Sequence, residues 1–324
     1  MTVLGESGKT GRMTEFTEIP VIRLGDRPDA EIAAEFRAAY GTTGFGYIAD
    51  HGIDPQLIDD LFAASARFHA LPLDQKMAVA VDKIHRGYIP INSSTDVNST
   101  LADVTKPNQS ASFMMMREDA QADADIYLSG PNRWPELDGF RQALEAYDTA
   151  MRALGQRLMK IALQAAEVTD TSVMSAFDAP TTWLRLLHYP PQPERSPEDL
   201  YGSAPHTDFG CLTLLVQDDV GGLQVKTPAG NWVDVPRREG TFVVNVGDML
   251  HRMSNGKLLS TPHRVINRSG RERYSCPFFY DPHVNTVIEP LPGTGDPKFP
   301  ALKFADFLRS ELEAAYDAHK PAAS

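Results

Sequence analysis

The chain has 324 residues, of which 42% are hydrophobic and 23% are charged, a composition that is ordinary for a globular protein with a sizeable core. The formal net charge of -12 argues against nucleic acid and anionic membrane surfaces as partners, because both are bound by clustered Lys and Arg. One local arginine would still be enough to hold an anionic small molecule.

The sequence has the features expected of a cytoplasmic protein. No segment approaches the roughly 20 apolar residues that a membrane-spanning helix requires. The polar first residues lack the apolar stretch of a signal peptide, and residues 1–15 are predicted to form a flexible tail. Cys211 and Cys276 each lie in an apolar stretch and are expected to be reduced core thiols.

Short strands and helices alternate in the N-terminal region, residues 16–180, which is expected to pack on a core further along the chain. Strands are expected at residues 19–24 and 44–52. Apolar residues at helical spacing predict helices at residues 28–44, 54–71 and 134–168. Between the last two helices, the Ser-, Asn- and Pro-rich stretch from Lys83 to Pro107 predicts a long surface loop of the kind that often forms a lid.

The second half of the chain is rich in short strands. Between residues 181 and 300, several apolar stretches are separated by Gly, Pro, Asn and Asp, which predicts a β-sandwich or barrel. A final helix is expected within residues 301–324. No linker separates the two halves, so the sequence predicts one structural domain of a mainly β fold class with flanking helices.

Two good metal ligands stand at the start of this half. His206 and Asp208 lie two residues apart in the sequence HTD, and on a strand such residues face the same side. His263, at the start of a β-branched stretch, is the best candidate for a third ligand. Two histidines and one carboxylate form the facial triad of non-haem Fe(II) oxygenases, which leaves coordination positions open.

The same two-residue spacing recurs in other strands. Arg273 and Ser275 are expected to face one way and to form a clamp for a carboxylate, because the guanidinium offers a two-pronged donor and the hydroxyl adds another. Arg185 and Tyr189 also share a face, and an arginine inside a barrel requires an anion or a hydrogen-bond partner. In the sequence NVGD, the polar side chains of residues 245 and 248 are predicted to fix a tight turn.

Taken together and in this order, these motifs resemble the iron- and 2-oxoglutarate-dependent oxygenases of the isopenicillin N synthase-like group. The resemblance rests on HTD, STPHRV and RYS, and continues through IPVIRL, GFGYIADHGI, LRLLHYPP, GGLQV and NVGD. It extends over residues 17–318. Leu187 departs from the pattern, since many plant members carry Asn at this position, near the co-substrate.

The resemblance implies a fold, a set of cofactors and a reaction. The fold is a double-stranded β-helix (jelly-roll) core at residues 181–300. Iron is held by His206, Asp208 and His263, and the distal carboxylate of 2-oxoglutarate is held by Arg273, Ser275 and Tyr189. The enzyme would use O2 to hydroxylate, desaturate or cyclise a small organic substrate, releasing succinate and CO2.

The substrate side is predicted from fewer signals. Arg185 is a candidate for binding an anionic group, which favours a small carboxylic acid, an amino acid or a peptide-like molecule. Arg86 and Tyr88 correspond to a stretch that lines the substrate pocket in the namesake of the family. Phe113, Met114 and Met116 are candidates for an apolar pocket wall. The sequence does not define an oligomeric state.

Two other functions are compatible with these residues. An oxidase of the same fold could work without 2-oxoglutarate, as the namesake does, and release of succinate and CO2 distinguishes the two. A non-catalytic jelly-roll module could instead keep a metal for structure. Because structural sites tend to be closed, a vacant coordination position that binds NO would exclude that module.

Overall fold

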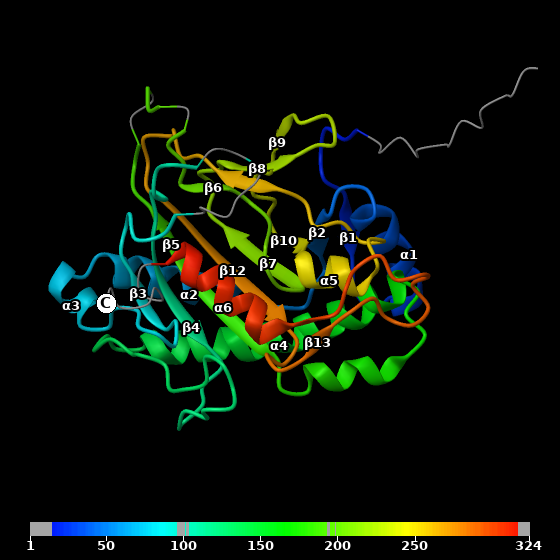
Figure 1. Cartoon of the computed structure of the whole chain (residues 1–324). Helices are drawn as coiled ribbons and strands as arrows, with labels where there is room; N and C mark the ends of the chain where they lie inside the picture. Colours follow the sequence, from blue (N-terminus) through cyan, green and yellow to red (C-terminus); the bar gives the residue numbers. More distant parts are fainter. Residues whose placement is uncertain (1–14, 96–100, 102–103, 193–194, 198, 317–324) are drawn as a thin grey trace, which may run out of the picture.

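Two β-sheets face each other in the computed structural model, which describes residues 15–95, 101, 104–192, 195–197 and 199–316 (Figure 1). The predicted flexible tail, apart from residue 15, lies outside the described residues. The larger sheet has eight strands in the order β1 (Val21–Arg23), β2 (Phe45–Ala49), β10 (Thr241–Val246), β7 (Leu212–Gln217), β12 (Arg273–Asp281), β5 (Thr181–Tyr189), β4 (Ala111–Met116) and β3 (Gly87–Ile89). The smaller sheet has four strands in the order β6 (Ser203–His206), β11 (His263–Val265), β8 (Leu223–Lys226) and β9 (Trp232–Asp234). This arrangement confirms the predicted mainly β fold class with a jelly-roll core.

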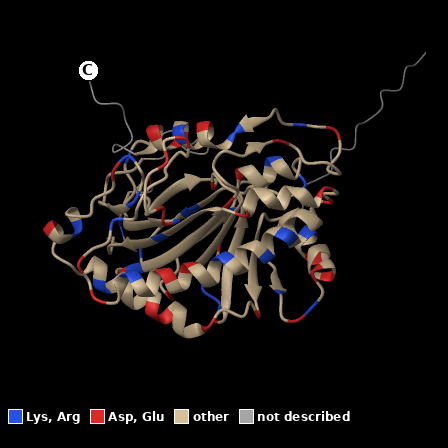
Figure 2. Cartoon of the chain, turned by 90° about the horizontal axis from the view of Figure 1, so that it is seen from below, with Lys and Arg blue, Asp and Glu red and all other residues tan. Residues whose placement is uncertain are grey.

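Helices cover the outer face of the larger sheet. They are α2 (Pro55–His69) and α4 (Phe140–Ala165), with α1 (Asp29–Tyr40) packed against α4 and the edge strands β1 and β2. The short α3 (Leu73–Met77) follows α2 and buries no residue, and the 3-10 helix η1 (Thr171–Phe177) stacks Phe177 on Tyr280 of β12. Helices α5 (Asp248–Met253) and α6 (Phe304–Ala315) lie in the second half of the chain. A short pair of strands, β13 (Val287–Ile288) and β14 (Leu302–Lys303), precedes α6. The Lys, Arg, Asp and Glu residues lie mainly on the outer helices and loops (Figure 2). Among the described residues, no helix is long and apolar enough to cross a membrane.

Helix boundaries follow local chemistry. Helix α2 begins as predicted, with Pro55 in its first turn and the Asp54 carboxylate accepting the Gln56 backbone N–H at 2.9 Å. The prediction of a helix from residue 134 was wrong for its first turns. Helix α4 begins only at Phe140, because Gly139 adopts a left-handed conformation with φ of 73°.

The predicted division into an N-terminal region up to residue 180 and a jelly-roll core after it stays a prediction. The larger sheet contains strands from both parts. Strands β1 to β4 come from the N-terminal region and are hydrogen-bonded into the same sheet as β5, β7, β10 and β12. The predicted loop from Lys83 to Pro107 contains β3, which is a correction, although residues 96–100 and 102–103 lie outside the described residues.

The antiparallel register of β5 and β12 fixes which side chains enter the space between the sheets. Arg273 lies opposite Tyr189, Ser275 opposite Leu187, and Phe279 opposite Trp183. Because successive side chains point to opposite faces, the odd-numbered residues of both strands share the inner face. The even-numbered residues, such as Phe278 and Leu184, are buried in the core that includes the helices.

Candidate active site

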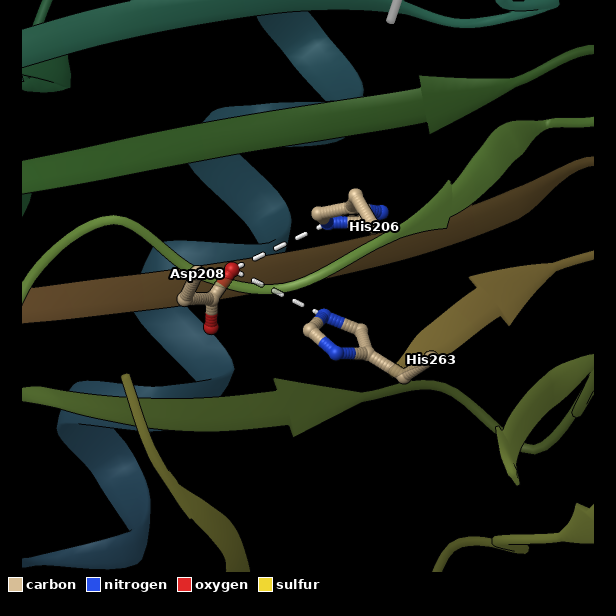
Figure 3. Close-up of side chains that lie close together, drawn as sticks. All are labelled: His206, Asp208 and His263. Carbon is tan, nitrogen blue, oxygen red and sulfur yellow. Dashed lines mark ion pairs between the residues drawn. The ribbon is translucent and has the colours of Figure 1, made fainter. Parts of the chain in front are cut away.

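The three predicted metal ligands lie together between the sheets (Figure 3). Strand β11 pairs with β6 so that His263 lies directly opposite His206, and Asp208 follows β6 by two residues. Oδ1 of Asp208 lies 3.7 Å from Nε2 of His206 and 3.6 Å from Nε2 of His263. The strand pairing therefore brings together residues that are more than 50 positions apart in the sequence.

Backbone carbonyls orient both imidazole rings. Nδ1 of His206 lies 2.7 Å from the carbonyl oxygen of Ala204, and Nδ1 of His263 lies 3.3 Å from that of Thr261. Since a carbonyl can only accept, Nδ1 carries the proton in each neutral ring, and the Nε2 lone pair is left for a metal. A partner on the second ring nitrogen is a common feature of metal-binding histidines.

The Asp208 carboxylate is held from behind. Its Oδ2 accepts hydrogen bonds from Asn245 Nδ2 at 2.7 Å and from the Thr213 hydroxyl, so that Oδ1 faces the histidines. Burial would raise the pKa of Asp208, but His263 and His206, with the hydrogen bonds from Asn245 and Thr213, hold it below its usual value. Two imidazole nitrogens and one carboxylate oxygen fit a divalent first-row metal with open positions.

The prediction that the side chains of Asn245 and Asp248 fix a tight local turn was wrong, because both bond to side chains elsewhere in the chain. The Asn245 side chain reaches Asp208 across the sheet instead of closing a local turn. Asp248 begins α5 and accepts hydrogen bonds from the hydroxyls of Ser260, at 2.6 Å, and of Thr207, at 3.1 Å.

A cavity of about 80 Å³ leads from the triad to Arg273. The Arg273 side chain is completely buried and donates to the carbonyl of Gly221 at 2.6 Å, to the Ser275 hydroxyl at 3.0 Å and to Gln217 Oε1 at 2.9 Å. Its guanidinium lies 4.7 Å from the centre of the Tyr189 ring. No carboxylate of the described residues pairs with it, and a buried positive charge without such a partner suits an anionic ligand.

A second cavity, of about 110 Å³, adjoins the first. Both cavities are lined by His206, Asp208, Arg185 and Phe279, so they meet at the candidate metal site. Helix α6, red in Figure 1, covers this second cavity with the side chains of Leu308 and Leu312. A group bound here would lie beside the triad and under the last helix.

Arg185 faces both cavities. Its Nε donates to the Ser112 hydroxyl at 2.9 Å and its NH1 donates to the Tyr316 hydroxyl at 3.2 Å. The side chain thus has neutral partners, and no ion pair with a carboxylate of the described residues balances its charge. Met114 lies opposite Arg185 on β4 and lines the second cavity with it.

The other four residues predicted to contact the substrate line neither of these two cavities. They are Arg86, Tyr88, Phe113 and Met116. The Arg86 guanidinium donates to the carbonyls of Ile84 at 2.9 Å, of Arg117 at 3.1 Å and of Leu128, beside a separate small cavity. Met116 borders that same separate cavity. Tyr88 and Phe113 pack against Phe68 in the core. On β4, Phe113 is one residue away from Met114, so it points to the opposite face of the sheet.

Sequence reasoning missed several residues of the two cavities. The set includes Asn108, Ser110, Trp183, Phe279 and Asp281. Phe279 and Asp281 lie an even number of residues from Arg273 and Ser275 on the same strand, and this two-residue alternation is the sequence signal that identifies them. Asp281 is 3% exposed, and its Oδ1 accepts the backbone N–H of Cys211 at 2.6 Å. Burial raises the pKa of Asp281 to about 7.

Comparisons with known proteins agree with this arrangement. Residues 180–282 match the family model of the 2OG-Fe(II) oxygenase superfamily, and residues 19–137 match that of the non-haem dioxygenase in morphine synthesis N-terminal region. The 2-oxoglutarate-Fe(II) type oxidoreductase hxnY of Emericella nidulans is 34% identical over 304 residues, which cover 89% of this chain and 85% of that protein.

Solved structures of proteins that bind 2-oxoglutarate have a similar fold. The crystal structure of a full-length Neurospora crassa protein in complex with alpha-KG and thymine has a TM-score of 0.79 and 28% identity, covering 91% of this chain and 96% of that one. The structure of JOX2 in complex with 2OG, Fe and JA has a TM-score of 0.77 and 27% identity, covering 93% of this chain and 90% of that one.

Proposed function

The chain belongs to the 2OG-Fe(II) oxygenase superfamily, in its isopenicillin N synthase-like class, and from that premise we propose which residues carry its chemistry. It is a 2-oxoglutarate-dependent dioxygenase with Fe(II) and 2-oxoglutarate as cofactors and O2 as co-substrate. When bound, these groups supply the oxidation of an organic substrate, coupled to the conversion of 2-oxoglutarate into succinate and CO2. The family predicted from the sequence is confirmed, and the two alternative functions are not favoured.

We propose that His206, Asp208 and His263 hold the iron. The observation that carries this proposal is the convergence of their ligand atoms, all within 4.8 Å of one another. Asn245 and the neighbouring Thr213 would keep Asp208 oriented, and the two backbone carbonyls would keep each imidazole in the tautomer that leaves Nε2 available.

Arg273, Ser275 and Tyr189 are proposed to bind the distal carboxylate of 2-oxoglutarate. The buried charge of Arg273 supports this, as does its place at the far end of a cavity that reaches the triad. Gln217 and the Gly221 carbonyl hold the guanidinium in place, so binding would require little reordering of the side chain.

The substrate is proposed to be a small organic molecule that carries a carboxylate and occupies the second cavity. Arg185 would bind the carboxylate, and Met114 would contribute to the apolar wall. The small molecules bound by the Neurospora crassa protein and by JOX2 support a small-molecule partner. A cytoplasmic location is proposed as well, supported by two buried free thiols that a reducing compartment keeps unpaired.

Anaerobic reconstitution with Fe(II), followed by 2-oxoglutarate, tests the co-substrate assignment. A weak visible charge-transfer band is expected when 2-oxoglutarate binds next to the iron. Iron binding without such a band would contradict the assignment, and Arg273 would then be reinterpreted as a substrate anchor.

A further inference from the structure

The inner faces of β5 and β12 present a defined order of side chains. The pairs of Ser275 with Leu187 and of Phe278 with Leu184 set a constant register, so Pro277 lies opposite Arg185. The next inward pair is Phe279 with Trp183, and the last is Asp281 with Thr181. With increasing distance from Arg273 along the strands, the second cavity is therefore lined first by the cation of Arg185, then by the rings of Trp183 and Phe279, and last by the carboxyl of Asp281.

Asp281 is a buried acid that has no role in the proposed binding of iron or 2-oxoglutarate. It lines the second cavity together with Arg185, and no Lys, Arg or His of the described residues forms an ion pair with it. Its carboxylate accepts the Cys211 backbone N–H, and the Trp183 side chain is a second polar neighbour. A buried carboxyl with so few donors is costly to maintain, and a donor supplied by a ligand would offset that cost.

We propose that the substrate is bifunctional, with an anionic oxygen at Arg185, an apolar middle between Trp183 and Phe279, and an amine or other N–H donor at Asp281. The proposal rests on the proposed function, because it assumes that the second cavity holds the substrate. It narrows the substrate class from carboxylic acids in general to molecules with complementary groups at both ends.

The spacing of the two groups also follows from the strands. Positions 277 and 281 are four residues apart, which is about 13 Å along a strand at roughly 3.3 Å per residue. The reach of the Arg185 side chain shortens this span but does not close it. The anionic group and the donor therefore belong at opposite ends of the substrate, as in an ω-amino acid, and not on one carbon, as in an α-amino acid.

Two matched sets of probes test this. The first is 4-(aminomethyl)benzoate, with 4-ethylbenzoate and 4-isopropylbenzylamine as shape-matched molecules that lack one group. The second is 6-aminohexanoate, with heptanoate and hexylamine. Their affinities are measured by calorimetry on the anaerobic Fe(II) enzyme at saturating 2-oxoglutarate, for the wild type and for Asp281→Asn, Arg185→Gln and Asp148→Asn.

Asp281→Asn keeps an oxygen that can accept the Cys211 N–H, so a purely structural role would leave the order of affinities unchanged. Asp148 is the matched control: it is also a buried acid, but it pairs with Arg152 at 2.5 Å and lines neither cavity. The expected result is at least tenfold tighter binding of one bifunctional probe than of both its partners. In Asp281→Asn, the bifunctional probe should bind no more tightly than the acid that lacks the amine. In Arg185→Gln, it should bind no more tightly than the amine that lacks the carboxylate. Asp148→Asn should keep both preferences.

The proposal is overturned if neither bifunctional probe binds more tightly than its partners in the wild type, or if Asp281→Asn keeps the full preference. The wild-type comparison stands even if a variant fails to fold. The charge-transfer band is recorded in the same samples. A band without any preference contradicts only this inference, whereas an absent band contradicts the proposed function.

Discussion

A β-carbon at position 210 would lie 1.8 Å from Oδ1 of Asp281, so only glycine allows the loop that follows Asp208 to lie against that carboxyl. The Gly210 backbone is outside the left-handed region, and steric exclusion is therefore the reason for the glycine. Gly210→Ala should displace the loop, lower the free energy of unfolding by about 1–3 kcal/mol and weaken metal binding. Chemical denaturation and Co(II) titration measure the two effects.

The double variant Gly210→Ala/Asp281→Ala is the control for this explanation. Removing the carboxyl creates room for the new methyl group, so the double variant should be destabilised by less than the sum of the single variants. Additive losses would mean that the methyl group meets something other than Asp281.

Asn245→Ala should weaken metal binding by roughly 10- to 100-fold, because the Asp208 carboxylate loses the donor that orients it. Titration with Co(II), which is stable in air, measures the change. Asn285→Ala serves as the control, since its side chain donates to the Asp125 carbonyl away from the site. Equal affinities in the two variants would show that Asn245 does not position Asp208.

Arg273→Gln should reduce the affinity for 2-oxoglutarate by at least ~30-fold, because a buried charge pair typically contributes about 2 kcal/mol or more. The charge-transfer band gives the binding curve. Arg271→Gln is the matched control two residues earlier, where the exposed side chain pairs with Asp219 at 3.6 Å. A loss of affinity in Arg271→Gln as large as in Arg273→Gln would point to a general effect of charge.

Arg86→Met is expected to act on stability and not on binding. The variant leaves three backbone carbonyls without their donor, which should cost on the order of 3 kcal/mol. Affinities for metal and 2-oxoglutarate should stay at wild-type values in the folded fraction. A selective loss of substrate binding with unchanged stability would restore Arg86 as a substrate contact.

Asp281 should make the stability of the metal-free protein depend on pH. Burial raises its pKa from 3.8 to about 7, so the folded state binds the proton more tightly than the unfolded state does. The stability that this proton contributes is complete below pH 3.8 and is lost as the pH rises to about 7. Relative to Asp281→Asn, the wild type should therefore lose stability across this range and level off above it, as measured by urea unfolding. A constant difference between the two proteins would contradict the raised pKa.

The sequence allowed the triad to be predicted because its signals are local. HTD places two ligand types on one face, and His263 opens a strand in the same half of the chain. The pairing of His263 with His206 could not be derived from spacing, since it depends on how β11 and β6 align. Similarly, the hydrogen bond from Asn245 to Asp208 joins elements 37 residues apart, and nothing near Asn245 in the sequence indicates it.

The substrate side was harder to predict for a different reason. Phe113, Met114 and Met116 form one apolar run, and only the pairing of β4 with β5 determines that Met114 lies at Arg185. Arginine is a residue type that often binds anions, yet the Arg86 side chain donates to backbone carbonyls. Such backbone partners cannot be recognised from the sequence.

The register between β5 and β12 has a consequence for how such an enzyme can change over generations. One end of the strand pair carries Tyr189, Arg273 and Ser275, proposed for a co-substrate that does not vary. The other end carries Trp183 and Asp281, which line only the cavity proposed for the compound being oxidised. Replacing a side chain at the second end leaves the backbone pairing and the first end intact. Point substitutions at a few positions could thus give a lineage new substrates while the catalytic half is inherited unchanged.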